Sequence, residues 1–279
     1  MPYAWWSMLA GRAVLLLLLL AFSRWALAQG GFFGFTEGYE GGGADLGEAE
    51  ARLRVGLGLG VAAGPNFQGS DKYRIRPAPF VFAGYGRFFV GFGGIGVNLY
   101  RAPGWGFGAI VSPSQGRKEN VDQRLAGLGD VDRTVNLGVY AVTYTRRFLT
   151  RAVVYTDAGG EHQGSVARLD VLARFRVDER VRLFAGPGLT WGSRQYQQTF
   201  FGVTEEQAAR SLQQFPEFQA TAGVNNLRLT AGANYRFATD WNLIGSVTAS
   251  RLSGQAGNSP IVETRQQYGA FLSAIYLFR

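Results

Sequence analysis

The sequence of 279 residues contains no cysteine, which excludes a disulfide framework and a zinc–thiolate site. It has one histidine, so histidine-based catalysis has a single candidate. After residue 28 the chain also lacks any apolar run near the roughly 20 residues that a membrane-spanning helix requires. Stability must therefore come from something other than disulfides, thiolate metal sites or membrane helices.

Residues 1–28 are typical of a cleaved secretory signal. Arg12 supplies the positive region, residues 13–22 are apolar, and Ala26-Leu27-Ala28 forms a small-residue cleavage site. The apolar stretch is about half the length of a membrane-spanning helix, which favours cleavage over retention. We therefore expect an exported chain that begins near Gln29.

The composition of the remaining chain is typical of a transmembrane β-barrel. Hydrophobic residues make up 47% of the sequence and glycine occupies 40 positions, while charged residues are only 17%. Apolar segments of about ten residues follow one another, which is the pattern of strands in an outer-membrane barrel. Such a barrel satisfies its backbone hydrogen bonds between strands and presents its apolar surface to lipid.

Alternation with a period of two supports this interpretation in residues 51–63, 165–177 and 227–237. In each segment apolar residues predicted to face lipid alternate with glycine, polar or charged residues predicted to face the lumen. The basic residues expected to face the lumen are Arg52, Arg54, Arg168, Arg174, Arg176, Arg228 and Arg236.

We predict an all-β fold, a transmembrane antiparallel up-and-down barrel of twelve strands. The predicted strands are 51–63, 73–83, 86–92, 95–101, 104–116, 133–147, 151–161, 165–177, 181–199, 226–237, 241–252 and 266–279. The even number returns both chain ends to the periplasmic side, with short turns there and long outer loops at 64–72, 117–132, 200–225 and 253–265. Loss of the hairpin within 86–101 would leave ten strands.

Aromatic residues mark the predicted strand ends, as interfacial girdles require. They are Phe88, Phe89, Trp105, Phe148, Tyr155, Phe237 and Trp241. The last strand ends with Tyr276 and Phe278 on one face, similar to the signal that barrel-assembly machinery recognises, although Arg279 follows the final aromatic.

Few residues suggest chemistry. His162 lies in a predicted outer turn, with no serine or aspartate placed by the sequence to support it as a base. Asp130 and Asp132 offer too few oxygens for a calcium site, so a turn is favoured. The G-x-G-x-G run at residues 56–60 lacks the following helix that a phosphate-binding loop requires. Thr204 to Gln207 forms a capping box that predicts a short outer helix. We expect no enzyme, cofactor or metal site.

Charge is divided unevenly along the chain. Residues 29–50 contain five acids and no base, whereas residues 51–279 carry a net charge of +11 from 26 basic and 15 acidic residues. The lumen arginines would either form an anion-attracting pore or pair with lumen acids such as Asp170. No basic module of a nucleic-acid-binding protein is present. The basic loop residues are hypothetical contacts for lipopolysaccharide phosphates; they are Lys72, Arg74, Arg76, Arg117 and Lys118.

Five motifs in order along residues 51–279 together resemble the MipA/OmpV family. They are the run from Gly58 to Phe80, G-L-G-D at 127–130, G-P-G-L-T-W at 186–191, and residues 200–211 and 251–263. Phe67 departs from the family pattern, which has tyrosine at that place.

The resemblance implies an outer-membrane scaffold for murein synthesis and remodelling, with a lytic transglycosylase and a peptidoglycan synthase as partners. It carries over no catalytic residues. Murein enzymes would meet the periplasmic side, which comprises residues 29–50 and the short turns. A narrow channel for small solutes and a surface adhesin or antigen are the alternatives.

Overall fold

The computed structural model describes residues 53–91 and 93–278. The predicted signal sequence at 1–28, the acidic segment at 29–50 and Arg52 lie outside the described residues. Within the described ranges, no helix is long and apolar enough to cross a bilayer.

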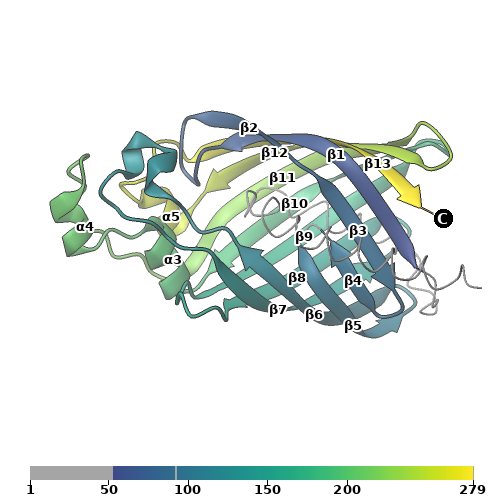
Figure 1. Cartoon of the computed structure of the whole chain (residues 1–279), viewed down its shortest axis with the longest axis horizontal. Coiled ribbons are helices and arrows are strands. Elements are labelled where there is room, and N and C mark those ends of the chain that lie inside the picture. Colours follow the sequence, from purple (N-terminus) through teal and green to yellow (C-terminus); the bar gives the residue numbers. More distant parts are fainter. Residues whose placement is uncertain (1–52, 92, 279) are drawn as a thin grey trace, which may run out of the picture.

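The chain folds into a closed antiparallel barrel in which each strand pairs with its neighbours in sequence and β13 pairs back onto β1. In Figure 1 the strands wrap around a common axis and are inclined to it. The strands are β1 (Arg54–Pro65), β2 (Tyr73–Pro77), β3 (Phe80–Tyr85), β4 (Phe88–Gly91), β5 (Gly94–Ala102), β6 (Trp105–Ser114), β7 (Thr134–Tyr144), β8 (Phe148–Asp157), β9 (Ser165–Arg176), β10 (Val181–Gly192), β11 (Gly223–Arg236), β12 (Trp241–Leu252) and β13 (Gln266–Phe278).

Segments β2 and β3 form one interrupted strand, because both pair with β1. Pro77 and Pro79 lack the N–H groups that a continuous ladder needs, so pairing stops between them. One bond survives there, from Ala78 N–H to the carbonyl of Gly60 at 2.8 Å. The barrel therefore has the twelve strand positions predicted from the sequence, and the short hairpin of β4 and β5 is present.

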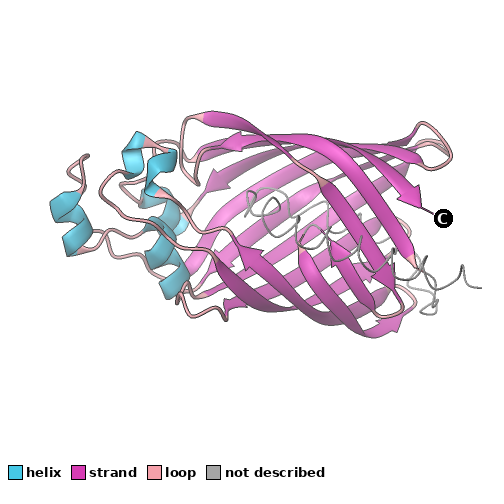
Figure 2. Ribbon diagram, viewed as in Figure 1, coloured by secondary structure: helices cyan, strands magenta, loops and turns pink. Residues whose placement is uncertain are grey.

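Apart from the tight turn between β4 and β5, short connections lie at one end of the barrel and longer ones at the other, and we call these the turn end and the loop end. Figure 2 shows the helices gathered at the loop end. They are the 3₁₀ turns η2 (Glu119–Val121) and η3 (Gln123–Leu125) and the helices α3 (Arg194–Phe201), α4 (Glu205–Arg210) and α5 (Gly254–Asn258). The capping box predicted at Thr204 is confirmed, with both of its hydrogen bonds formed at the start of α4.

Several predicted boundaries are wrong; the strand predicted at 151–161 ends at Asp157 and the one predicted at 226–237 begins at Gly223. The strand predicted at 181–199 ends at Gly192, because the Ser193 side chain accepts the N–H of Tyr196 and starts helix α3. The turn predicted at Phe148 to Thr150 lies at 145–147 instead. There Thr145 Oγ1 accepts the N–H of Phe148 at 2.9 Å, which makes Phe148 the first residue of β8.

The predicted alternation of faces is confirmed along β9 and β11. Phe175 and Leu229 are more than half exposed toward lipid, while Leu172 and Thr230 between the outward positions are buried. At the turn end the outward aromatic rings touch one another in two separate groups, one around Tyr100 and Trp105 on β5 and β6 and one around Trp241 and Tyr276 on β12 and β13. These rings form the interfacial girdle expected of a barrel in a membrane.

Two aromatic residues assigned to that girdle from the sequence face the interior instead. Tyr155 is buried with Val153 and Val166, and Phe89 packs edge to face on Tyr140 with ring centroids 5.9 Å apart. Both have the inward parity of their strands, which position near a strand end does not reveal.

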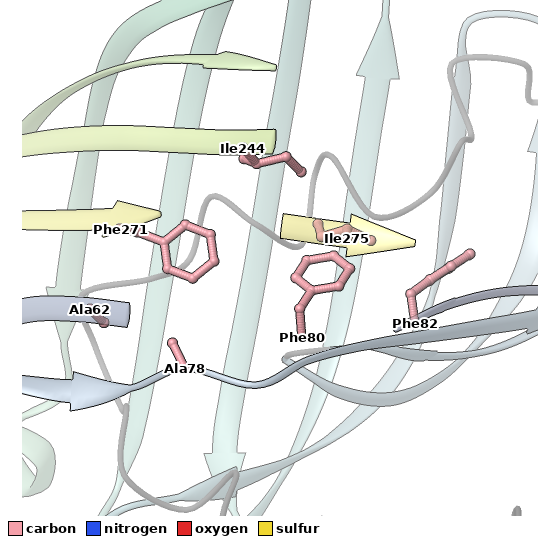
Figure 3. Packing of buried hydrophobic residues seen from close by; sticks show 7 residues of the cluster. All are labelled: Ala62, Ala78, Phe80, Phe82, Ile244, Phe271 and Ile275. Atoms are coloured by element: carbon pink, nitrogen blue, oxygen red, sulfur yellow. The ribbon is translucent and has the colours of Figure 1, made fainter. Parts of the chain in front are cut away.

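Side chains fill much of the interior. One apolar cluster lies inside β1, β3, β12 and β13, where Figure 3 shows the rings of Phe80 and Phe271 with Ile275 and Ala62 around them. Inward glycines make room for such side chains: a Cβ on Gly232 would collide with the Phe184 ring that lies over it. The glycines that alternate with apolar residues along the strands thus have a packing role inside the barrel.

Candidate functional site

A buried ion pair crosses the interior from β9 to β11. Arg228 Nη2 donates to Asp170 Oδ1 and Arg228 Nη1 donates to Thr190 Oγ1 at 2.8 Å. Both charged side chains are only 9% exposed. The strand between them contributes Gly188, and a Cβ there would collide with the Asp170 carboxylate. A charge pair buried this deeply is maintained only when its geometry is good.

The other arginines predicted for the lumen have varied surroundings. Arg168 lies over the Tyr155 ring, 6.0 Å from its centroid, and Arg174 lies over the Tyr144 ring at 5.7 Å. Arg176 and Arg236 donate to backbone carbonyls of the turn that joins β9 to β10. Arg54 is exposed at the start of β1. A binding role for these arginines stays a prediction.

Charge is balanced at the loop end of the described chain. The loops and the strand ends beside them hold eleven bases and eleven acids. The bases are Lys72, Arg74, Arg76, Arg117, Lys118, Arg124, Arg133, Arg194, Arg210, Arg251 and Arg265. The acids are Asp71, Glu119, Asp122, Asp130, Asp132, Asp157, Glu161, Glu205, Glu206, Glu217 and Glu263. The described part of the loop end therefore has no net charge.

The strand interiors and the turn end carry the whole excess. Thirteen arginines lie there among the described residues, against four acids: Asp170, Asp178, Glu179 and Asp240. Eight of these arginines are exposed at the turn end and form what we call the arginine rim: Arg54, Arg87, Arg146, Arg147, Arg176, Arg180, Arg182 and Arg236. The acids Asp178, Glu179 and Asp240 also lie at this end, so the described turn end keeps a net positive charge, which attracts anionic partners from a distance set by the salt concentration.

At the loop end, four loops share a hydrophobic core of their own, which we call the loop cap. Its buried side chains come from segments far apart in the sequence, namely Phe67, Leu125, Leu128, Val203, Phe215 and Ile261. Arg124 joins two of the loops by donating to the carbonyls of Pro260 at 2.7 Å and Ile261 at 3.0 Å. The outer loops are thus packed against one another.

Asp122 is the polar centre of the loop cap. Its side chain is fully buried and accepts hydrogen bonds from Asn66 Nδ2 at 3.2 Å, Ser70 Oγ at 3.3 Å and Lys72 Nζ at 3.1 Å. Burial by itself would raise the pKa of Asp122, but the N–H of Arg124 and the Asn66 and Lys72 donors hold it below the ordinary value. The carboxylate is therefore charged at neutral pH and joins two loops.

The loop bases considered as lipopolysaccharide contacts are engaged within the loops. Lys72 binds Asp122, which raises the pKa of the lysine. Lys118 Nζ lies 2.9 Å from Asp130 Oδ2 and 2.7 Å from Asp132 Oδ1, so both aspartates form ion pairs with this lysine. Burial lowers the pKa of Arg117 to about 10, and this arginine donates to the carbonyl of Phe200 at 2.7 Å.

His162 lies in the turn between β8 and β9, as predicted, exposed and with a positive φ of 51°. Within residues 53–91 and 93–278 no three histidine, aspartate or glutamate side chains are grouped closely enough to hold a metal ion. His162 lies within electrostatic range of Asp157, whose carboxylate already accepts hydrogen bonds from the Thr134 hydroxyl and from the N–H groups of Gly159 and Gln163.

The family model for MltA-interacting protein MipA matches residues 57–278. The MltA-interacting protein of Escherichia coli K12 is 26% identical over 229 residues, which cover 79% of this chain and 88% of that protein. Its counterpart in Shigella flexneri has the same identity and coverage. The matched region includes essentially the whole described barrel.

Two solved structures align with most of the chain. NanC porin aligns with a TM-score of 0.40 at 9% identity, covering 81% of this chain and 99% of that one. Pseudomonas putida OprB aligns with a TM-score of 0.42 at 8% identity, covering 81% and 94%. The strand pairing, rather than these scores, establishes the closed barrel of this chain.

Proposed function

Because the chain belongs to the family of MltA-interacting proteins, we propose that it is an outer-membrane scaffold that holds murein-processing enzymes against the periplasmic end of its barrel. The first partner is a lytic transglycosylase, as the name of the E. coli relative indicates for that protein. A peptidoglycan synthase is the second partner that the family resemblance implies.

The arginine rim is the observation that supports docking of partner enzymes at the turn end. Bacterial barrels place their short turns in the periplasm and their long loops outside the cell. On this rule the turn end, with eight exposed arginines, faces the compartment in which murein enzymes work. Complementary charge accelerates encounter and sets orientation, so an enzyme with an acidic face would be captured there.

The turn that joins β9 to β10 is ordered enough to present part of this surface. Asp178 Oδ1 accepts the N–H groups of Arg180 at 2.6 Å and Val181 at 2.7 Å. These two bonds hold the pKa of Asp178 below its ordinary value. The carboxylate therefore remains charged at neutral pH and keeps both hydrogen bonds of the turn. Arg180 is thus held at a fixed place on the rim.

Binding of the purified barrel, in lipid nanodiscs, to a lytic transglycosylase from the same envelope tests the proposal. The rim variant is Arg146→Glu/Arg147→Glu/Arg180→Glu, and the matched control is Arg133→Glu/Arg194→Glu/Arg210→Glu at the loop end. Both variants change the net charge equally. We expect the association rate of the rim variant to fall about tenfold or more, with a steep salt dependence in the parent protein.

Two results would count against the proposal in different ways. An absence of any saturable binding by the parent protein would remove the scaffold function itself. Equal binding by both variants would leave the scaffold in place but move its docking surface away from the arginine rim.

A narrow anion channel is the second candidate, because inward-facing arginines line the strands from Arg168 to Arg236. The apolar clusters inside the barrel and the loop cap oppose a wide pore. Single-channel recording in planar bilayers separates the two functions. Large, anion-selective open currents would favour transport, whereas a scaffold predicts no sizeable current.

A further inference from the structure

Two tyrosines and three arginines converge inside the barrel near its turn end. Arg101 comes from β5, Tyr140 and Tyr144 from β7, Arg151 from β8 and Arg174 from β9. Arg101 and Arg151 are within electrostatic range of Tyr140, and all three arginines are within range of Tyr144. We call these five residues the arginine–tyrosine vestibule.

A β-bulge directs Arg101 into this group. The register of β5 against β6 shifts between Asn98 and Tyr100, so that Leu99 has no partner and both Leu99 and Tyr100 are exposed toward lipid. Asn98 faces the interior, and strict alternation from it would send Arg101 outward. The bulge restores the inward direction of Arg101, which is a common use of bulges beside functional sites.

The tyrosines are fixed in place. Tyr140 reaches across Gly108 on β6 and donates to Asn98 Oδ1 on β5 at 2.8 Å. Both rings pack on an apolar floor of Val142, Leu149, Leu172 and Phe184. Arg174 lies over the Tyr144 ring and donates from Nη2 to the carbonyl of Thr145 at 2.7 Å. The vestibule is therefore built before any ligand arrives.

Two of the three arginines have a guanidinium nitrogen that makes no hydrogen bond. Arg101 Nε and Arg174 Nε are buried and make no hydrogen bond. Asp170, the nearby interior carboxylate, already accepts from Arg228. Buried guanidinium donors without a partner favour the entry of an anion with planar oxygens that fit an arginine.

We propose that the arginine–tyrosine vestibule binds carboxylate groups that enter from the turn end. Each carboxylate would accept from one guanidinium in a two-pronged geometry, so that Arg101 and Arg174 would each hold one carboxylate. These carboxylates come either from a small free polycarboxylate or from the acidic residues of the chain's own segment 29–50. The chemistry of recognition is the same in both cases, and the inference does not depend on the scaffold function.

The test is calorimetric titration of the full barrel in nanodiscs with citrate, which carries three carboxylates. We compare the parent with two variants. Arg101→Gln/Arg174→Gln removes two positive charges from the vestibule, and Arg146→Gln/Arg147→Gln removes two positive charges from the exposed rim. The vestibule variant should lose at least about tenfold in affinity. The rim variant should stay within about twofold, because screening weakens its longer-range effect.

A second arm distinguishes the two sources. The five acids of segment 29–50 are converted to amides, in the variant Glu37→Gln/Glu40→Gln/Asp45→Asn/Glu48→Gln/Glu50→Gln. If the segment supplies the carboxylates, citrate should bind this variant more tightly than the parent. If a free ligand supplies them, the two affinities should be equal.

Nitrogen-15 spectra of the arginine Nε–H groups provide a readout that needs no vestibule variant. Citrate should shift the Arg101 and Arg174 signals in the parent or in the amide variant. Three results would overturn the proposal: no saturable binding in either protein, equal loss of affinity in the vestibule and rim variants, or unshifted Arg101 and Arg174 signals at saturation.

Discussion

Arg228 on β11 reaches across Gly188 on β10 to bind Asp170 on β9, so one ion pair spans three strands inside the barrel. The intervening strand can be crossed only because Gly188 has no side chain. The same arrangement recurs where Tyr140 crosses Gly108 to reach Asn98. Inward glycines in this barrel are crossing points for polar contacts between strands that are not neighbours.

Gly188→Ala is therefore predicted to destabilise the barrel. The added methyl group would displace the Asp170 carboxylate and weaken the ion pair, which should lower the free energy of unfolding by about 3 kcal/mol. Urea unfolding in lipid vesicles measures this loss. Gly223→Ala is the control, because a Cβ there has no heavy atom within 4 Å. Equal stability of the two variants would contradict the prediction.

The two charges should also be energetically coupled. Asp170→Asn removes the carboxylate that faces a buried guanidinium, and such losses cost about 3 to 5 kcal/mol. In the double variant Asp170→Asn/Arg228→Gln the buried positive charge is gone as well. A double-mutant cycle should then give a coupling energy of about 1 to 3 kcal/mol, and simple additivity of the two single effects would show that the pair is not coupled.

Asp122→Asn is predicted to loosen the loop cap without opening the barrel. Hydrogen exchange of amides in 66–72 and 119–128 should become at least about tenfold faster, since hydrogen bonds to the buried carboxylate are weakened. Exchange in β9 and β10 should not change. Faster exchange throughout the strands would show that the variant disturbs the whole fold rather than the cap.

This contribution depends on pH in a defined direction. The pKa of Asp122 is below its ordinary value of 3.8, so the folded cap favours the charged form. Its contribution is fully present above pH 3.8 and is lost as the pH falls through the lower folded pKa. Burial raises the pKa of Glu263, and the charge of Asp122 raises it further, so the pKa of Glu263 should be lower in Asp122→Asn than in the parent; in strong acid both carboxyl groups are protonated. The difference between parent and Asp122→Asn should therefore vanish in acid.

Tyr276→Ala/Phe278→Ala is predicted to slow assembly by the barrel-assembly machinery. The two rings lie 4.8 Å apart on β13, and Tyr276 also contacts Trp241 at 5.2 Å. The folded fraction, measured by the shift of unheated protein in SDS gels, should fall severalfold in assisted assembly relative to spontaneous folding in detergent. Leu277→Ala, on the opposite face of the strand, is the control. An equal loss in both folding reactions would indicate a stability effect only.

Much of the fold follows from local rules that a single sequence carries. Strands β9 and β11 alternate apolar and polar residues over most of their length, with Leu172 as an apolar residue on the inward face of β9, so both their existence and their faces could be predicted. The alternation of short turns and long loops along the chain then predicted twelve strands. The prediction of boundaries was wrong where a side chain determines the end of a strand, as Ser193 does by capping helix α3 directly after β10.

The vestibule was missed for two physical reasons. Arg101 follows a bulge, and a bulge reverses the parity that period-two analysis relies on. Arg151 lies on β8, whose inward face also carries Leu149 and Val153, so no alternation of polarity marks it. The alternation signal assumes a polar interior, and β8 has an apolar one.

The loop cap could not be foreseen from any local pattern. Its core combines Phe67, Leu125, Val203 and Ile261 from four separate loops, each with one or a few apolar residues in a polar context. Only closure of the barrel brings those loops together. Asp122 is likewise an ordinary loop aspartate until Asn66, Ser70 and Lys72 surround it.

The cap also continues the seam at which the first and last strands meet. The N–H groups of Glu263 and Thr264 donate to the carbonyl of Gly69, at 2.8 Å and 3.0 Å, and the N–H of Tyr268 donates to the hydroxyl of Tyr73. These bonds cannot form before β13 has paired with β1. We therefore expect the cap to fold together with closure of the barrel. Resistance of the loops to an added protease, followed during refolding of the purified protein, should then report the closed fraction.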